Sequence, residues 1–74
     1  MTAQTLDTKG LNCPLPILKT KKAIKTMDAG AMLEVLSTDP GSVKDFEAFA
    51  RATGNALVES TEAEGVFRFL IQKS

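Results

Sequence analysis

GLNCPLPILKTKKAIKTM, residues 10–27, is the stretch that decides how the chain folds. It places Cys13 directly before Pro14, with Pro16 two residues further on. Proline is tolerated in the first turn of a helix, where its missing N–H would have no partner, but not further in. We therefore predict a helix that begins at about Cys13 or Pro14 and ends at about Met27.

The residues after the prolines have the spacing of an amphipathic helix. Apolar or small residues recur at steps of three and four and are expected to face inward: Ile17, Thr20, Ala23, Ile24 and Met27. The opposite side is expected to face water and carries Leu15, Leu18, Lys19, Lys22 and Lys25. Lysines in such a pattern usually form a solvated helix face. Exposed leucines among them favour a second interpretation, a small docking surface for an acidic partner.

Cys13 is the only cysteine, and the chain has no histidine. A single cysteine cannot form an internal disulfide, and without histidine a zinc site of the usual Cys/His kind is not expected. We therefore predict no metal. A hydrolase is disfavoured because the general base of a Cys/His pair is missing. A thioredoxin-like dithiol is excluded because Pro16 stands where the second cysteine would be.

One thiol at the start of a helix can still support group transfer. The positive end of the helix dipole and unpaired N–H groups favour the thiolate, which is the reactive form. A persulfide requires only thiolate attack at each end, so sulfane sulfur transfer is within the reach of Cys13. Gly10, Pro14 and Pro16 would position it, the prolines by fixing the backbone rather than by contributing to a core. The alternative is a small buried hydrophobic residue, which is what most free cysteines are.

Length and composition predict one domain spanning residues 1–74. The chain has 43% hydrophobic residues, enough for a small core. Nine basic and nine acidic residues cancel, so no net field attracts nucleic acid or a membrane surface. No apolar run resembles a secretory signal or a membrane span. We expect a cytoplasmic monomer in which Cys13 stays reduced.

Outside residues 10–27, four segments have the alternation or the turn boundaries of strands: residues 4–7, 31–38, 55–61 and 66–73. Gly30 is expected to close the first helix. A second helix should begin with a cap at Asp39 or Ser42 and end at Gly54. Its expected inward residues are Val43, Phe46, Phe49, Ala50 and Thr53.

The short connection at residues 62–65 predicts that the last two strands form an antiparallel hairpin. The order is then β-α-β-α-β-β. Right-handed crossovers place both helices on one face of a mixed four-stranded sheet, which is an α+β two-layer sandwich.

The stretches TLDTKGLNCPLP and STDPGSVKDF, together with the terminal hairpin, give the chain a family resemblance. It resembles the TusA family of small sulfur carriers, also called SirA-like or YedF-like, whose signature is Cys-Pro-x-Pro after a short strand. The resemblance covers roughly residues 5–73. It implies a two-layer β-α-β-α-β-β sandwich similar to the C-terminal domain of a bacterial translation initiation factor.

The resemblance also implies a sulfur relay that uses no cofactor. Cys13 would accept persulfide sulfur from a cysteine desulfurase or a rhodanese-like donor and pass it to a cysteine of a DsrE-type acceptor. We expect Leu15, Leu18, Lys19 and Lys22 to dock these partners. Carriers that serve 2-thiouridine formation in tRNA commonly have glutamate between the prolines, where this chain has Leu15. The pathway therefore stays open between tRNA thiolation and oxidation of sulfur compounds. The alternative function is a non-catalytic regulatory or protein-interaction module with a structural Cys13.

Overall fold

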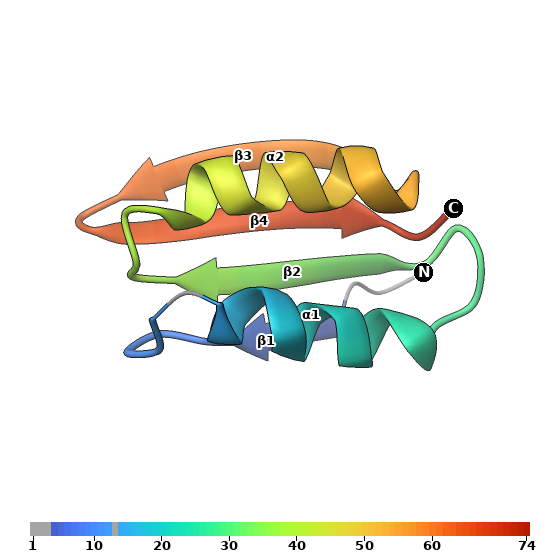
Figure 1. Cartoon of the computed structure of the whole chain (residues 1–74), viewed down its shortest axis with the longest axis horizontal. Helices are drawn as coiled ribbons and strands as arrows, with labels where there is room; N and C mark the ends of the chain where they lie inside the picture. The colour runs from blue at the N-terminus through green and yellow to red at the C-terminus, as the bar shows by residue number, and fades with distance from the viewer. Residues whose placement is uncertain (1–3, 13) are drawn as a thin grey trace.

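The computed structural model describes residues 4–12 and 14–74. Two helices lie on one face of a four-stranded sheet, in the order β-α-β-α-β-β (Figure 1). The predicted two-layer architecture is therefore confirmed. The elements are β1 (Gln4–Asp7), α1 (Leu15–Lys25), β2 (Met32–Ser37), α2 (Ser42–Thr53), β3 (Ala56–Ala63) and β4 (Val66–Gln72).

The sheet has the strand order β1-β2-β4-β3. β1 runs parallel to β2, whereas β4 is antiparallel to both of its neighbours, β2 and β3. The two central strands alternate between a face covered by the helices and an open face, as the period of two requires. Four apolar residues on the covered face have at most 1% exposure: Leu33, Val35, Phe69 and Ile71.

Aromatic rings from α2 and β4 fill the space between helices and sheet. Phe46 and Phe69 are fully buried and stacked, with ring centroids 4.4 Å apart and an interplanar angle of 16°. Phe49 meets Phe46 edge-on at 6.4 Å. Ile24 and Met27 close the core from the side of α1. The core is thus one cluster to which both helices and the central strands contribute.

The end of α1 differs from the prediction. The helix stops at Lys25 rather than Met27, and Gly30 does not cap it. Gly30 instead donates its N–H to the carbonyl of Lys73, 2.7 Å away, in the turn before β2. The Lys73 ammonium donates to the carbonyls of Ile24 and Met27 at 2.9 and 2.8 Å. A side chain from the far end of the sequence therefore satisfies the end of α1.

The start of α2 also differs. The N-cap is Gly41, with no side-chain cap, so the prediction of a cap at Ser42 was wrong. Ser42 is buried, and its hydroxyl lies 2.6 Å from that of Ser37 at the end of β2. Asp39 lies two residues before this N-cap, and its carboxylate accepts the Gly41 N–H at 3.1 Å.

α2 ends before Gly54, as predicted, but Thr53 is exposed rather than inward. Its hydroxyl donates to the carbonyl of Phe49 at 2.7 Å. In the hairpin, β3 continues two residues beyond the predicted end, to Ala63. Only Glu64 and Gly65 remain for the turn, at φ values of 52° and 80°. Two positive φ values in a two-residue turn are typical of type I′.

Candidate functional site

The loop before Cys13 is tied to the end of β2. Thr8 is fully buried, and its N–H and hydroxyl both donate to the carbonyl of Leu36, at 2.8 and 2.5 Å. Gly10 has a φ of +84°, which favours glycine, and its N–H donates to the Thr38 hydroxyl at 2.9 Å. Leu11 closes the turn by donating to the carbonyl of Thr8 at 3.1 Å. The backbone leading into the motif is therefore fixed at several points.

The two motif prolines have different surroundings. Pro14 is exposed and is the N-cap of α1, and its carbonyl accepts the Leu18 N–H at 3.0 Å. Pro16 lies in the first turn and is buried. Its carbonyl also accepts the hydroxyl of the buried Thr20, at 2.8 Å. The expectation that both prolines only fix the backbone was wrong for Pro16, which contributes to the interior.

Cys13 itself lies outside the described residues. Its neighbours in the chain, Asn12 and Pro14, are exposed. None of the three residues after position 13 offers a free N–H, because Pro14 and Pro16 have none and that of Leu15 bonds to the Asn12 carbonyl at 2.9 Å. The expectation of unpaired N–H groups was therefore wrong for these three residues. The positive end of the helix dipole still favours an anion here, and no acidic residue in the first turn opposes it.

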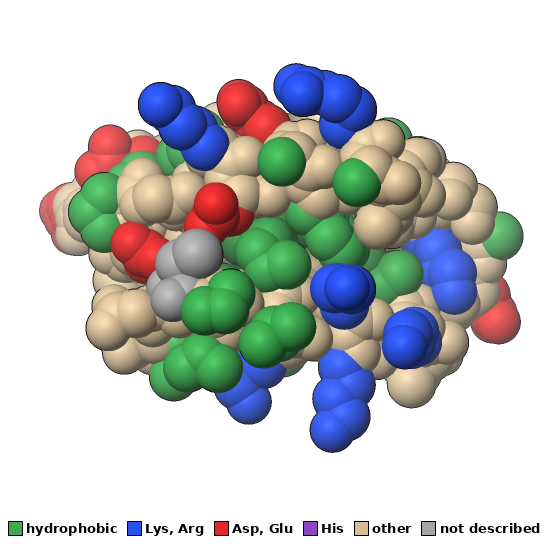
Figure 2. Space-filling view, viewed as in Figure 1, with side chains coloured by type: hydrophobic (Ala, Val, Ile, Leu, Met, Phe, Trp, Pro, Cys, Tyr) green, Lys and Arg blue, Asp and Glu red, His purple; other side chains and the backbone are tan. Residues whose placement is uncertain are grey.

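A leucine–lysine surface, defined as Leu15, Leu18, Lys19 and Lys22, follows the motif along α1. All four side chains are exposed, as predicted, with Leu15 at 44% and Leu18 at 51%. Figure 2 shows hydrophobic side chains gathered over the start of α1 and basic ones over its later turns. The surface thus combines apolar and cationic groups directly after position 13.

Two depressions border this region. An open groove of about 390 Å³ runs between α1 and α2 from Pro14, with apolar walls and one residue of each charge; it includes Pro14, Ile17, Phe49, Ala52, Lys21 and Asp45. Sequence reasoning missed the groove because it exists only once the two helices pair.

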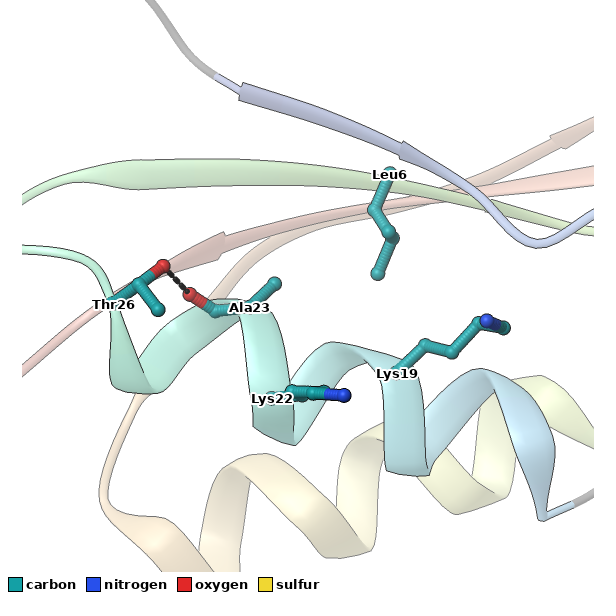
Figure 3. A pocket seen from close by; sticks show the side chains of 5 residues that line it. All are labelled: Leu6, Lys19, Lys22, Ala23 and Thr26. Carbon is teal, nitrogen blue, oxygen red and sulfur yellow. Dashed lines mark hydrogen bonds between the residues drawn. The ribbon is translucent and has the colours of Figure 1, made fainter.

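The second depression, about 270 Å³, lies between β1 and α1 and is lined by Leu6, Lys19, Lys22, Ala23 and Thr26 (Figure 3). The predicted site residues therefore border two different depressions. Pro14 borders the groove between the helices, whereas Lys19 and Lys22 border the depression beside β1.

Among residues 4–12 and 14–74, no three His, Cys, Asp or Glu side chains come together in a way that could hold a metal ion. No helix in this part of the chain is long and apolar enough to cross a bilayer.

Comparison with known proteins identifies the family. The model of the family described as sulfurtransferase TusA matches residues 4–73. The sulfur carrier protein TusA of Allochromatium vinosum is 62% identical, over 96% of this chain and 93% of that one. A putative sulfur carrier protein of Neisseria meningitidis serogroup A is 51% identical, over 97% of each chain.

A solved structure agrees with these sequence relatives. The crystal structure of a SirA-like protein from Desulfitobacterium hafniense superposes with a TM-score of 0.81 at 30% identity, covering 92% of this chain and 93% of that one. The resemblance predicted from the Cys-Pro-x-Pro motif and its surrounding elements is confirmed. The chain belongs to the TusA family of sulfur carriers.

Proposed function

We propose that Cys13 carries the sulfur, as a persulfide, between a donor protein and an acceptor protein. Its thiolate attacks the terminal sulfur of a donor persulfide. A new S–S bond forms at Cys13, the donor's S–S bond breaks, and the donor cysteine leaves as a thiolate. The acceptor thiolate repeats the same step on Cys13. No electrons are gained or lost overall, so the relay uses no redox cofactor.

The observation that carries this proposal is the position of the cysteine motif in the fold of a sulfur carrier. Thr8 and Gly10 are hydrogen-bonded to Leu36 and Thr38 at the end of β2, and α1 begins two residues after Cys13. Both neighbours of Cys13 are exposed. Anchored backbone on both sides of the motif supports transfer because less entropy is lost when the partners meet.

The leucine–lysine surface supports docking of both partners in turn. Leu15 and Leu18 supply apolar area beside the motif, and Lys19 and Lys22 supply positive charge further along α1. Apolar contact contributes affinity, whereas charge complementarity mainly raises the association rate and selects the partner. An acidic surface with an apolar centre is the complement on donor and acceptor.

The partner classes that fit are a cysteine desulfurase or a rhodanese-like donor, and a DsrE-type protein as acceptor. The relay would work in the cytoplasm, where the thiol stays reduced. Leu15 removes the negative charge that carriers for tRNA thiolation commonly have between the prolines. The pathway is tRNA thiolation or oxidation of reduced sulfur compounds, and the choice of acceptor decides between them.

Mass spectrometry of the intact protein tests the proposal. After incubation with a cysteine desulfurase and free cysteine, the wild type should gain the mass of one sulfur atom, which a reductant then removes. Cys13→Ser should gain nothing while keeping the circular dichroism spectrum of the wild type. An unmodified wild-type mass with desulfurase and rhodanese donors alike would contradict the relay. Retained partner binding and cellular activity in Cys13→Ser would favour the interaction module instead.

A further inference from the structure

β1 forms one edge of the sheet and, within the described residues, pairs only with β2. Successive residues of a strand direct their backbone groups to opposite edges. Thr8 donates its N–H to the Leu36 carbonyl of β2, so Leu6, two residues earlier, also faces β2. Thr5 and Asp7 therefore direct their N–H and carbonyl groups outward. Such a row of groups is a template for another strand.

The depression beside β1 shows what side chains such a strand would carry. In Figure 3, Leu6 points from β1 toward α1, where Ala23 and the stems of Lys19 and Lys22 lie. The floor is apolar, and both charged groups at the rim are cationic. A strand added to β1 would direct every second side chain to this side. An apolar residue would contact Leu6, and acidic residues on either side of it would meet the two lysines.

The other edge of the sheet is unsuited to the same partner. β3 has a bulge between Leu57 and Glu59, which interrupts regular pairing. It also carries the exposed acids Glu59 and Glu62. An acidic strand would be repelled there. On β1 the one acid, Asp7, is paired with Lys9 at 3.8 Å, so the charges of the two edges favour β1.

We propose that the β1 edge binds an extended acidic segment of a partner protein as an added strand. One apolar side chain of that segment occupies the depression over Leu6 and Ala23, and its carboxylates pair with Lys19 and Lys22. The inference rests on the proposed function in taking this partner to be one that exchanges sulfur with Cys13. It adds a mode of recognition, backbone pairing at a sheet edge, to the exposed side chains of α1.

A synthetic peptide tests this binding mode on the full chain. The acidic peptide carries glutamate, valine and glutamate at alternate positions, with threonine between them. NMR titration should shift the amide signals of Thr5, Asp7 and Ala23. The same peptide with lysine for glutamate should not bind. A version N-methylated on the backbone edge that faces β1 should also fail, because it keeps the side chains but loses the hydrogen bonds.

Two variants of one residue isolate the backbone contribution. Thr5→Pro removes an outward N–H, which an edge strand tolerates, whereas Thr5→Val keeps it. Both variants lose the hydroxyl that donates to Glu34, so they differ chiefly in the backbone group. We expect Thr5→Pro to weaken binding about threefold to tenfold relative to Thr5→Val, the range for one net hydrogen bond. Lys19→Glu with Lys22→Glu should reverse the preference toward the lysine peptide, whereas Lys44→Glu on α2 should leave it unchanged.

Each possible result bears on the inference alone. Equal binding of the N-methylated peptide, shifts confined to the groove between α1 and α2, or no shifts at millimolar peptide would overturn it. If Thr5→Pro does not fold, the methylated peptide still decides. Sulfur loading of Cys13, measured by mass in the same samples, reports separately on the relay. A protein that gains sulfur but does not bind the acidic peptide would keep the proposed function and lose the added strand.

Discussion

At the scale of single residues, Thr20 connects the motif to the core. It is fully buried on the inward face of α1, and its hydroxyl donates to the carbonyl of Pro16 at 2.8 Å. Thr20→Val keeps the shape but removes this bond. We expect the free energy of unfolding to fall by about 0.5–1.5 kcal/mol, the usual net value of a hydrogen bond. Urea denaturation measures it.

The matched control for Thr20 is Thr26, the C-cap of the same helix. Its hydroxyl makes the same kind of bond, to the carbonyl of Ala23 at 2.8 Å, but at an exposed position. Water can replace the lost bond there, so Thr26→Val should change stability by less than about 0.5 kcal/mol. Equal losses in the two variants would show that burial does not set the value of the Thr20 bond.

Glu64 holds a strained backbone conformation. Its φ of 52° is the only positive value at a non-glycine residue in the described part of the chain. The left-handed conformation costs most residues about 1 kcal/mol, and Asn–Gly is the preferred pair for this turn. We expect Glu64→Asn to raise the free energy of unfolding by about 0.5–1 kcal/mol and Tm by several degrees. Thermal unfolding followed by circular dichroism measures the shift.

Glu62 supplies the control for the charge. Glu62→Asn also removes one carboxylate, but two residues earlier, inside β3, where the backbone is extended. Asparagine is poorly suited to strands, so this variant should be neutral or slightly destabilised. A comparable gain in both variants would mean that the effect of Glu64 is one of charge rather than of backbone conformation.

At the scale of elements, Arg68 connects three strands across the open face of the sheet. From β4 it pairs with Glu34 on β2, and at 2.7 Å with Glu59 on β3. The bond from Arg68, together with one from Thr5, lowers the pKa of Glu34 below its ordinary value of 4.5. A lowered pKa in the folded state means that the contribution is present above pH 4.5 and is lost as the pH falls through the lowered value.

We predict that the difference in stability between wild type and Arg68→Gln depends on pH. The stability advantage of wild type over Arg68→Gln should be largest above pH 4.5 and shrink as the pH falls below it. Urea midpoints measured across this range give the difference directly. Arg51→Gln removes a positive charge from the exposed side of α2. Its stability difference from wild type should not shrink as the pH falls. If the stability difference were independent of pH, the contribution of Arg68 would not come from its pairing with Glu34.

The interiors of the helices and strands could be predicted from the sequence, but their ends could not. The interiors of the elements follow from periodicity, because burial of one face sets the period. The ends depend on distant residues. Lys73 binds the carbonyls of Ile24 and Met27 from 49 and 46 positions away, and Ser42 meets Ser37 of the preceding strand instead of capping α2. No local pattern contains these partners.

Some features of the candidate site could likewise be predicted from the sequence, and others could not. The exposed leucines and lysines of α1 follow from the helical period and are where it places them. The burial of Pro16 could not be predicted, because it requires a packed neighbour. The same holds for both depressions, which need two elements each.

At the scale of the whole molecule, the zero net charge conceals a separation. The lysines of α1 lie on the helix layer, whereas β3 and its turn carry Glu59, Glu62 and Glu64 at the far edge of the sheet. This separation would orient the proposed acidic partner toward α1, beside the motif. Because these charges are exposed, salt should slow the encounter.

Whether docking depends on where the apolar residues lie can be tested with two exposed side chains of similar size. Leu18 on α1 is 51% exposed, and Val58 at the bulge of β3 is 48% exposed. Burying the exposed half of a leucine against a partner contributes about 1 kcal/mol, which corresponds to about a fivefold change. We expect Leu18→Ser to lower kcat/KM for sulfur loading by about this factor, and Val58→Ser to leave it unchanged. Both variants should unfold near the wild-type temperature, since neither side chain belongs to the core. Equal loss from both would mean that the donor does not dock on the face that follows the motif.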